Sequence, residues 1–277
     1  MKVSFYLYIA LFAAALSACE DVVTIPLDEG DKKYVIDAYI ESEGSPQATI
    51  SQTQAYNNQA SPLRIENAIV SITDAKTPSI TVQLDKQTSP GVYTTTSPFA
   101  GTQGHVYELR VQIGTEVFTA RDTLKRITPI DAIKVEKNAN TDTRLSIKID
   151  QQEPAGLGDQ YRWIWYANGQ TQLHPGFYAT ADDMLVDGNY ISNLTIFNAE
   201  YSYGSFEYEI PHGAAVRIKV LSLSRPVFLY YQQLQMGSYG QNMFSPPPAN
   251  APGNIQGGAL GFFRASAVSW SPETIYP

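Results

Sequence analysis

The sequence is poor in cysteine, histidine and charge, and each shortage excludes a class of protein. Cys19 is the single cysteine in 277 residues, so the chain cannot form an internal disulfide, a CxxC redox pair or a cysteine-ligated zinc site. The three histidines have no His-Glu-x-x-His spacing, and a Gly-x-Ser-x-Gly elbow is absent. Charged residues make up 17% and the net charge is −8, which disfavours nucleic acid as a partner. We therefore expect no catalytic residues, no metal and no cofactor, in a protein that is not an enzyme.

The amino terminus has the layout of a secretory signal peptide. Lys2 precedes an apolar run at 3–15, which is shorter than the roughly 20 residues of a membrane-spanning helix. Leu16-Ser17-Ala18-Cys19 follows and resembles the lipobox of bacterial lipoproteins. The resemblance implies that 1–18 is removed and that Cys19 is acylated with fatty acids such as palmitate, several of which together hold a protein firmly in a membrane. The alternative is an ordinary secreted protein with a chance cysteine near its cleavage site.

Acidic residues follow Cys19 directly. We interpret 19–32 as an acidic lipidated tether. Glu20 and Asp21 at its start resemble the signal that sends lipoproteins to the outer face of the outer membrane. The resemblance favours the cell surface over the periplasmic face, although fuller versions of that signal carry a longer acidic cluster.

Residues 33–126 alternate between apolar and polar side chains, which is typical of half-buried strands. Ile36, Ala38 and Ile40 share one face of a first strand. Alternation at 105–113 predicts a longer strand that turns at Gly114 into a neighbouring strand. Several short strands within one region predict a β-sandwich domain.

Residues 127–277 form a second predicted β domain with a different composition. Seven aromatic residues lie in 20–126, whereas 21 lie in 127–277. The alternation continues at 145–150, and a serine, a proline and an apolar stripe predict one packed helix near 225–236. The run Ile127-Thr128-Pro129 is the predicted joint between the two domains.

Two parts of the sequence resemble a known family. The block Asn254-Ile255-Gln256-Gly257-Gly258-Ala259-Leu260-Gly261-Phe262-Phe263 and the opening strand at 34–40 are similar to a domain-of-unknown-function family of Bacteroidota outer-membrane lipoproteins. The resemblance implies a lipoprotein encoded beside TonB-dependent receptors. It also implies an N-terminal sandwich similar to Ig-like and carboxypeptidase-regulatory domains.

The aromatic run at 161–166 is the most prominent candidate for ligand binding. As a strand, it places Trp163 and Trp165 on one face. If exposed, the two indoles would stack on sugar rings or on a partner protein. We favour the alternative, in which they belong to a core strand packed beneath the helix.

Asp182, Asp183 and Asp187 form the densest acidic cluster in the second half of the chain. The stretch 182–189 loosely resembles a calcium loop, but the alternating Asp-x-Asp-x-Asp-Gly order is missing. We interpret it as a solvated loop. The fold could also bring two such acids together as a glycosidase pair.

Two long irregular segments, 169–189 and 238–258, carry aromatic residues that a merely disordered segment would lack. We predict that partner contacts involve Phe177, Tyr178, Tyr239 and Phe244. The leading functional hypothesis is a non-catalytic outer-membrane lipoprotein, accessory to a TonB-dependent uptake or assembly complex, whose partner is a TonB-dependent receptor or another envelope protein. The alternatives are a surface glycan- or peptide-binding lipoprotein and, more remotely, a hydrolase.

Overall fold

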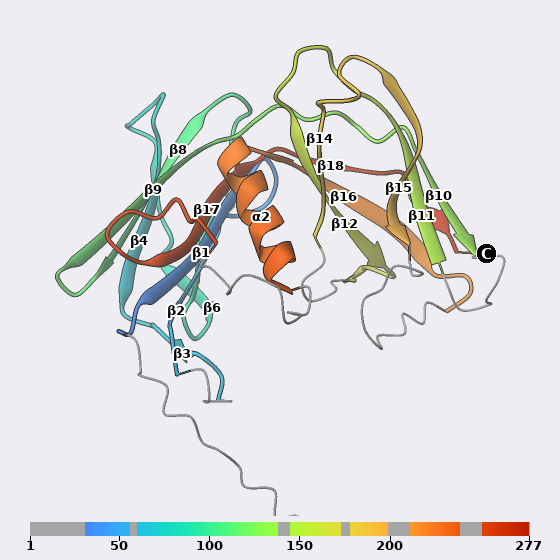
Figure 1. Ribbon diagram of the computed structural model, residues 1–277. Coiled ribbons are helices and arrows are strands. Elements are labelled where there is room, and N and C mark those ends of the chain that lie inside the picture. Colours follow the sequence, from blue (N-terminus) through green and yellow to red (C-terminus); the bar gives the residue numbers. More distant parts are fainter. Residues whose placement is uncertain are drawn as a thin grey trace, which may run out of the picture. The chain divides into compact units, whose positions relative to one another are not determined.

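The computed structural model describes residues 31–55, 60–137, 145–172, 178–198, 211–238 and 251–276. Residues Lys32–Pro277 cluster as one unit. Strands dominate the described residues, which contain a single helix, α2 (Arg225–Ser238) (Figure 1). The predicted mainly β class with one packed helix is therefore confirmed. The predicted signal peptide, Cys19, Glu20 and Asp21 lie outside the described residues.

The first sandwich consists of two sheets. Its strands are β1 (Tyr34–Glu41), β2 (Gln47–Gln52), β3 (Leu63–Arg64), β4 (Ala68–Asp74), β5 (Thr81–Gln83), β6 (Lys86–Ser89), β7 (Val92–Thr94), β8 (Val106–Ile113), β9 (Glu116–Thr123) and β17 (Leu260–Ser266). One sheet has the order β17-β1-β2-β7-β6 with β3 beside β2, and the other has the order β5-β4-β8-β9. Ile36, Ile40, Leu109 and Val111 are buried in the core between them. The predicted alternation and the turn at Gly114, which has a positive φ, are confirmed.

The second sandwich also consists of two sheets. Its strands are β10 (Ala132–Lys137), β11 (Leu145–Gln152), β12 (Gln160–Ala167), β13 (Gln170–Thr171), β14 (Ala179–Asp182), β15 (Tyr190–Asn198), β16 (Ala215–Leu223), β18 (Val268–Trp270) and β19 (Thr274–Ile275). One sheet has the order β10-β11-β15, and the other β13-β12-β16-β18, with β14 beside β12 and β19 beside β16. The core between them includes Ile147, Ile149, Ile218 and Val220.

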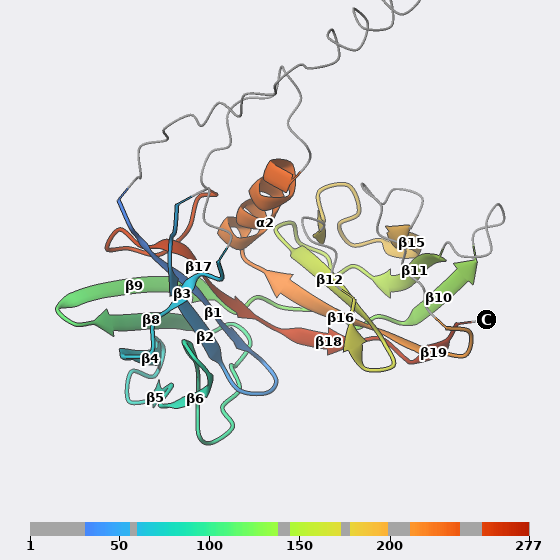
Figure 2. The same ribbon diagram turned by 90° about the horizontal axis from the view of Figure 1, so that it is seen from below.

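Strand β17 connects the two sandwiches. It pairs in parallel with β1, from Val35 opposite Leu260 to Glu41 opposite Ser266. One residue later the chain enters β18, which pairs with β16 (Figure 2). The division into 33–126 and 127–277 stays a prediction, but the sheet of the first sandwich takes a strand from the second segment.

The block that carries the family resemblance positions β17. The side chain of Asn254 accepts a hydrogen bond from the backbone N–H of Phe263 at 2.8 Å and donates one to the carbonyl of Phe263 at 2.8 Å. Gly261 has a φ of +103°, and a Cβ there would collide with the backbone carbonyl of Ile36. Only glycine fits this close approach of β17 to β1, as expected for this glycine-rich stretch.

Helix α2 packs on the outer side of the β12-β16 sheet. Val227 and Phe228 are buried against Leu221 and Leu223 of β16, together with Phe262. The helix extends two residues beyond the predicted end at 236. None of the helices in the described ranges combines the length and the apolar character that a membrane crossing requires.

The predicted joint is fixed to both sandwiches. Ile127 packs against both cores. The Thr128 hydroxyl donates a hydrogen bond to the carbonyl of Gln152 at 2.7 Å, and the Ser222 hydroxyl donates one to the carbonyl of Lys125 at 3.0 Å. The segment therefore holds its neighbours in place instead of acting as a free linker.

Candidate functional site

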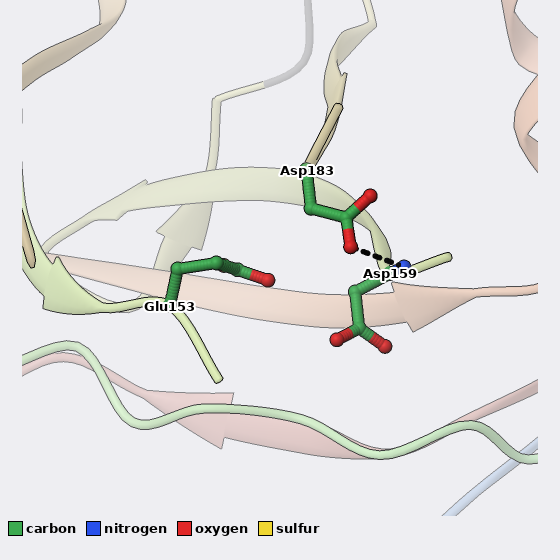
Figure 3. Close-up of side chains that lie close together, drawn as sticks. All are labelled: Glu153, Asp159 and Asp183. Atoms are coloured by element: carbon green, nitrogen blue, oxygen red, sulfur yellow. Dashed lines mark hydrogen bonds between the residues drawn. The ribbon is translucent and has the colours of Figure 1, made fainter. Parts of the chain in front are cut away.

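Three carboxylates meet at one edge of the second sandwich. Glu153 follows β11, Asp159 precedes β12, and Asp183 follows β14. One oxygen from each residue lies within 4.8 Å of the oxygens offered by the other two. Figure 3 shows the three side chains pointing toward one another. Their exposed fractions are 1%, 5% and 3%, so three acidic groups share a site that is almost free of solvent.

Each carboxylate is held through one of its oxygens. Asp183 accepts hydrogen bonds on Oδ2 from the backbone N–H groups of Gly158 at 2.8 Å and of Asp159 at 3.0 Å. Glu153 accepts one on Oε1 from the Tyr161 hydroxyl at 2.9 Å. Asp159 forms an ion pair through Oδ2 with Arg126, whose Nε lies at 2.8 Å. The positions of all three groups are thus set by the protein itself.

The second oxygen of Glu153 has a different environment. Glu153 Oε2 is buried and has no hydrogen-bond partner among the described residues. Burial, together with the negative charges of Asp159 and Asp183, raises the pKa of Glu153 to about 7, while the Tyr161 hydroxyl and Arg126 oppose that rise. Hydrogen bonding to Asp159 raises the pKa of Arg126, so its guanidinium stays charged. If ionised, the three acids and Arg126 carry a net charge of −2.

The carboxylates do not face one another across an open cleft. A depression of about 480 Å³ nearby is lined by residues 103–104, 123–126 and 156–159. It reaches Asp159 and Arg126, whereas Glu153 and Asp183 do not line it. A glycosidase needs room for its substrate between its two acids, and the hydrolase alternative stays an untested prediction.

The cluster lies at the base of two joined loops, residues 153–159 and 183–189, which we call the paired loops. Besides the hydrogen bonds to Asp183, the backbone N–H of Gly156 donates to Asp187 Oδ1 at 2.6 Å. Beyond this polar base the loops expose three large apolar side chains: Leu157 at 69%, Met184 at 68% and Leu185 at 89%. Leu157, Met184 and Leu185 therefore form an exposed apolar tip on loops whose base is held by hydrogen bonds.

Comparison with known proteins identifies the family. The sequence matches the family described as "Domain of unknown function (DUF4249)" over residues 20–270. The chain belongs to this family. No curated protein matches the sequence. A solved structure titled "Biofilm associated protein - BSP domain" is similar with a TM-score of 0.22 and 10% identity, over 87% of this chain and 29% of that chain.

In this DUF4249 chain the predicted stacking residues are core residues. Trp163 and Trp165 are buried, and Trp165 packs against Phe197 with ring centroids 5.1 Å apart. Ligand stacking by these two indoles is therefore wrong, and their favoured placement in the core is confirmed, although the helix packs on the opposite face of β12 and does not cover them. The physical reason is that the β10-β11-β15 sheet covers the face of β12 on which they lie.

Of the predicted contact residues, Tyr178 lies within the described residues, whereas Phe177, Tyr239 and Phe244 lie outside them. Tyr178 is half-buried, and its ring lies 5.2 Å from that of Tyr231 of α2, tilted by 34°. The Arg162 guanidinium lies over both rings, 5.0 Å from the centroid of Tyr178 and 4.4 Å from that of Tyr231. Much of the Tyr178 ring is therefore already used to join β14 to the helix.

The three aspartates of the acidic run at 182–189 make structural contacts, although the sequence predicted a solvated loop. Asp183 is buried in the cluster, Asp187 binds the neighbouring loop, and Asp182 pairs with Arg225 at 3.1 Å. The interpretation as a solvated loop is wrong for Asp183, because two backbone N–H groups replace its water.

Sequence reasoning missed Glu153, Asp159 and Arg126. One signal was available for Glu153. Leu145, Ile147 and Ile149 alternate inward along β11, and the same spacing continues through Gln151 to Glu153. An acid at a core-facing position indicates a specific buried partner. The partners themselves come from distant loops, which no local pattern joins.

Proposed function

We propose that this protein is a non-catalytic outer-membrane lipoprotein that serves a TonB-dependent uptake or assembly complex. Its lipid anchor is Cys19, and its partner is a TonB-dependent receptor or another envelope protein. The resemblance to Bacteroidota lipoproteins supports this proposal. We also propose that the protein lies on the cell surface. The observation that carries the contact role is the apolar tip of the paired loops.

The exposed tip suits protein contact for two reasons. Leu157, Met184 and Leu185 would gain free energy from burial, about 25 cal/mol for each Å² of apolar surface removed from water. Exposed apolar side chains grouped on neighbouring loops are a feature of interaction sites on soluble proteins. The bonded base also keeps the loops ordered before binding, which reduces the entropy lost on association.

Anchoring is tested by replacing Cys19 with alanine. We expect the variant to leave the membrane fraction and the wild type to remain in it. Mass spectrometry of the mature amino terminus should show a diacylglyceryl cysteine at residue 19. An unmodified amino terminus in the wild type would refute the anchor.

The contact surface is tested by a pull-down from solubilised outer membrane. The variant carries Leu157→Ser, Met184→Ser and Leu185→Ser. The matched control carries Ile69→Ser and Val117→Ser, which alter exposed apolar residues of the first sandwich. We expect the wild type and the control to recover a TonB-dependent receptor and the loop variant to lose it at both low and high salt. Equal recovery by all three proteins would overturn the proposed contact surface.

A second candidate function is recognition of a glycan or peptide in its own right. Trp270 is half-buried on the outer side of the β12-β16 sheet. Tyr166 lies 5.1 Å from it, and the Arg217 guanidinium lies 5.0 Å from its ring. Such a polar aromatic surface suits flat, hydrogen-bonding ligands. Loss of glycan or peptide binding in Trp270→Ala, with receptor recovery unchanged, would favour this candidate.

A further inference from the structure

We propose that Glu153, Asp159 and Asp183 form a calcium site that joins the paired loops. The inference is independent of the proposed function, because it concerns only what the three carboxylates bind. It rests on the positions of their oxygens, on an unpartnered buried oxygen and on the net charge.

The geometry fits one cation between the three residues. Calcium binds oxygen ligands at 2.3–2.6 Å, so two oxygens on one ion can be up to about 5 Å apart. The three oxygens lie within 4.8 Å of one another. Magnesium binds at 2.0–2.1 Å and spans at most about 4.2 Å. At the upper limit of these distances an ion equidistant from the three oxygens would lie about 2.8 Å from each, so calcium needs an inward shift of only about 0.2 Å, whereas magnesium needs about 0.7 Å.

One oxygen of each carboxylate is already used by a neighbouring group. Glu153 uses Oε1 for Tyr161, Asp159 uses Oδ2 for Arg126, and Asp183 uses Oδ2 for two backbone N–H groups. Of the other oxygens, Glu153 Oε2 has no hydrogen-bond partner among the described residues. Glu153 Oε2 is fully buried in this state, and Figure 3 shows the end of that side chain directed toward the two aspartates. A buried acceptor without a donor is costly unless a ligand satisfies it.

A second buried polar group lies on the same side of β11. Gln151 precedes Glu153 by two residues and is 1% exposed, and neither of its amide atoms has a partner among the described residues. Unsatisfied polar atoms therefore accumulate at this end of the strand.

The charge and the ligand type select the ion. Three carboxylates and one guanidinium leave two negative charges, which a divalent cation neutralises. The cluster of Glu153, Asp159 and Asp183 offers oxygen ligands without histidine or cysteine, and such a set favours a hard cation over zinc or copper. Calcium accepts the irregular arrangement of six to eight oxygens that loops and water provide.

The test is calcium binding to the full chain, purified in detergent and freed of metal with EDTA that is then removed. At pH 8, isothermal titration with calcium chloride should show one site, and saturating calcium should raise Tm by at least about 3 °C. Terbium supplies a second readout, because Tyr161 is bonded to Glu153 and its ring lies 5.9 Å from that of Trp163. Excitation of these rings should sensitise terbium luminescence, and added calcium should quench it.

Two variants and one matched control locate the site. Glu153→Gln keeps the acceptor for Tyr161 and removes one charge, so calcium affinity should fall at least tenfold. Asp159→Asn supplies the same comparison if the first variant does not fold. Asp122→Asn alters a buried carboxylate outside the cluster and should bind calcium as the wild type does.

Three results would overturn the proposal. The first is a wild-type protein without calcium heat, Tm shift or terbium signal. The second is a folded Glu153→Gln or Asp159→Asn variant with wild-type affinity, and the third is an equal Tm shift with magnesium at the same concentration. The first result would mean that Glu153 is kept neutral by a proton instead.

Discussion

Replacing Glu41 with glutamine should destabilise the protein strongly, because Glu41 joins three strands through a buried ion-pair network. Its Oε1 lies 2.8 Å from Arg264 of β17, and its Oε2 contacts Lys219 of β16 at 2.5 Å. The side chains of Glu41, Arg264 and Lys219 are 8%, 11% and 17% exposed. The network therefore connects the sheet of the first sandwich to that of the second.

The magnitude follows from this burial. Removing one partner of a buried ion pair costs about 3–5 kcal/mol, because the remaining charge is left without compensation. The glutamine side chain keeps one hydrogen-bond acceptor for Arg264, so we expect the free energy of unfolding to fall by about 3 kcal/mol. This loss corresponds to a fall in Tm of about 6–12 °C for a unit of this size. The double variant Glu41→Gln with Lys219→Met should be less destabilised than the sum of the two single variants, because the stranded ammonium is gone.

The effect also has a defined pH dependence. Burial acts to raise the pKa of Glu41, but Arg264 and Lys219 outweigh it, and the pKa lies below its ordinary value of 4.5. Stability from a carboxylate with a lowered pKa is present above the ordinary value and is lost as the pH falls through the folded-state value. The difference between wild type and Glu41→Gln should therefore be full at pH 7 and shrink below about pH 4.

The assay is thermal and urea unfolding followed by circular dichroism. Glu43→Gln is the matched control. Glu43 is exposed, and the amide oxygen of the new glutamine can still accept the hydrogen bond that the Trp270 indole N–H donates to Glu43 at 3.0 Å. We expect this control to change stability by less than about 0.5 kcal/mol. A Glu41→Gln variant as stable as Glu43→Gln at pH 7 would refute the reasoning.

Three further predictions concern other parts of the fold. Burial raises the pKa of Asp122 from 3.8 to about 6, so wild-type stability should fall as the pH rises from about 4 to 6. The Asp122→Asn variant should not show that fall. At pH 8 its free energy of unfolding, measured in urea, should exceed that of the wild type by up to about 3 kcal/mol, because each unit of pKa shift corresponds to about 1.4 kcal/mol. A variant less stable than the wild type at pH 8 would contradict the prediction. Gly261→Ala should cost at least about 2 kcal/mol and more than Gly258→Ala, since a Cβ at Gly258 meets nothing within 4 Å; equal thermal shifts would contradict the close contact with Ile36. The isolated fragment 33–126 lacks β17 and the core residues Phe263 and Ala265, so trypsin should degrade it faster than 32–277, and equal resistance would show that β17 is dispensable.

The carboxylate cluster could be predicted from the sequence only in part. Asp183 belongs to a visible acidic run, and Glu153 occupies a core-facing position after β11. Their meeting with Asp159 depends on how β11, β12 and β14 are arranged in two different sheets. Residues 30 positions apart become neighbours only when those sheets pack, and no local spacing encodes that packing.

The sequence by itself determined which residues form strands and which side of each strand faces a core. Ile36, Ala38 and Ile40 were correctly assigned to one face, and all three are buried, because successive side chains of a strand point to opposite faces and the period is a local property. The helix after Ser224 was likewise determined locally by its apolar stripe.

The tertiary structure alone decided which faces are covered and which distant strands pair. Alternation placed Trp163 and Trp165 on one side of β12, but the presence of the β10-β11-β15 sheet over that side made them core residues. The parallel pairing of β17 with β1 joins residues more than 200 positions apart. Its physical basis is the fit of Gly261 against the carbonyl of Ile36 and the ion pair of Glu41 with Arg264. Both interactions form only when β17 pairs with β1.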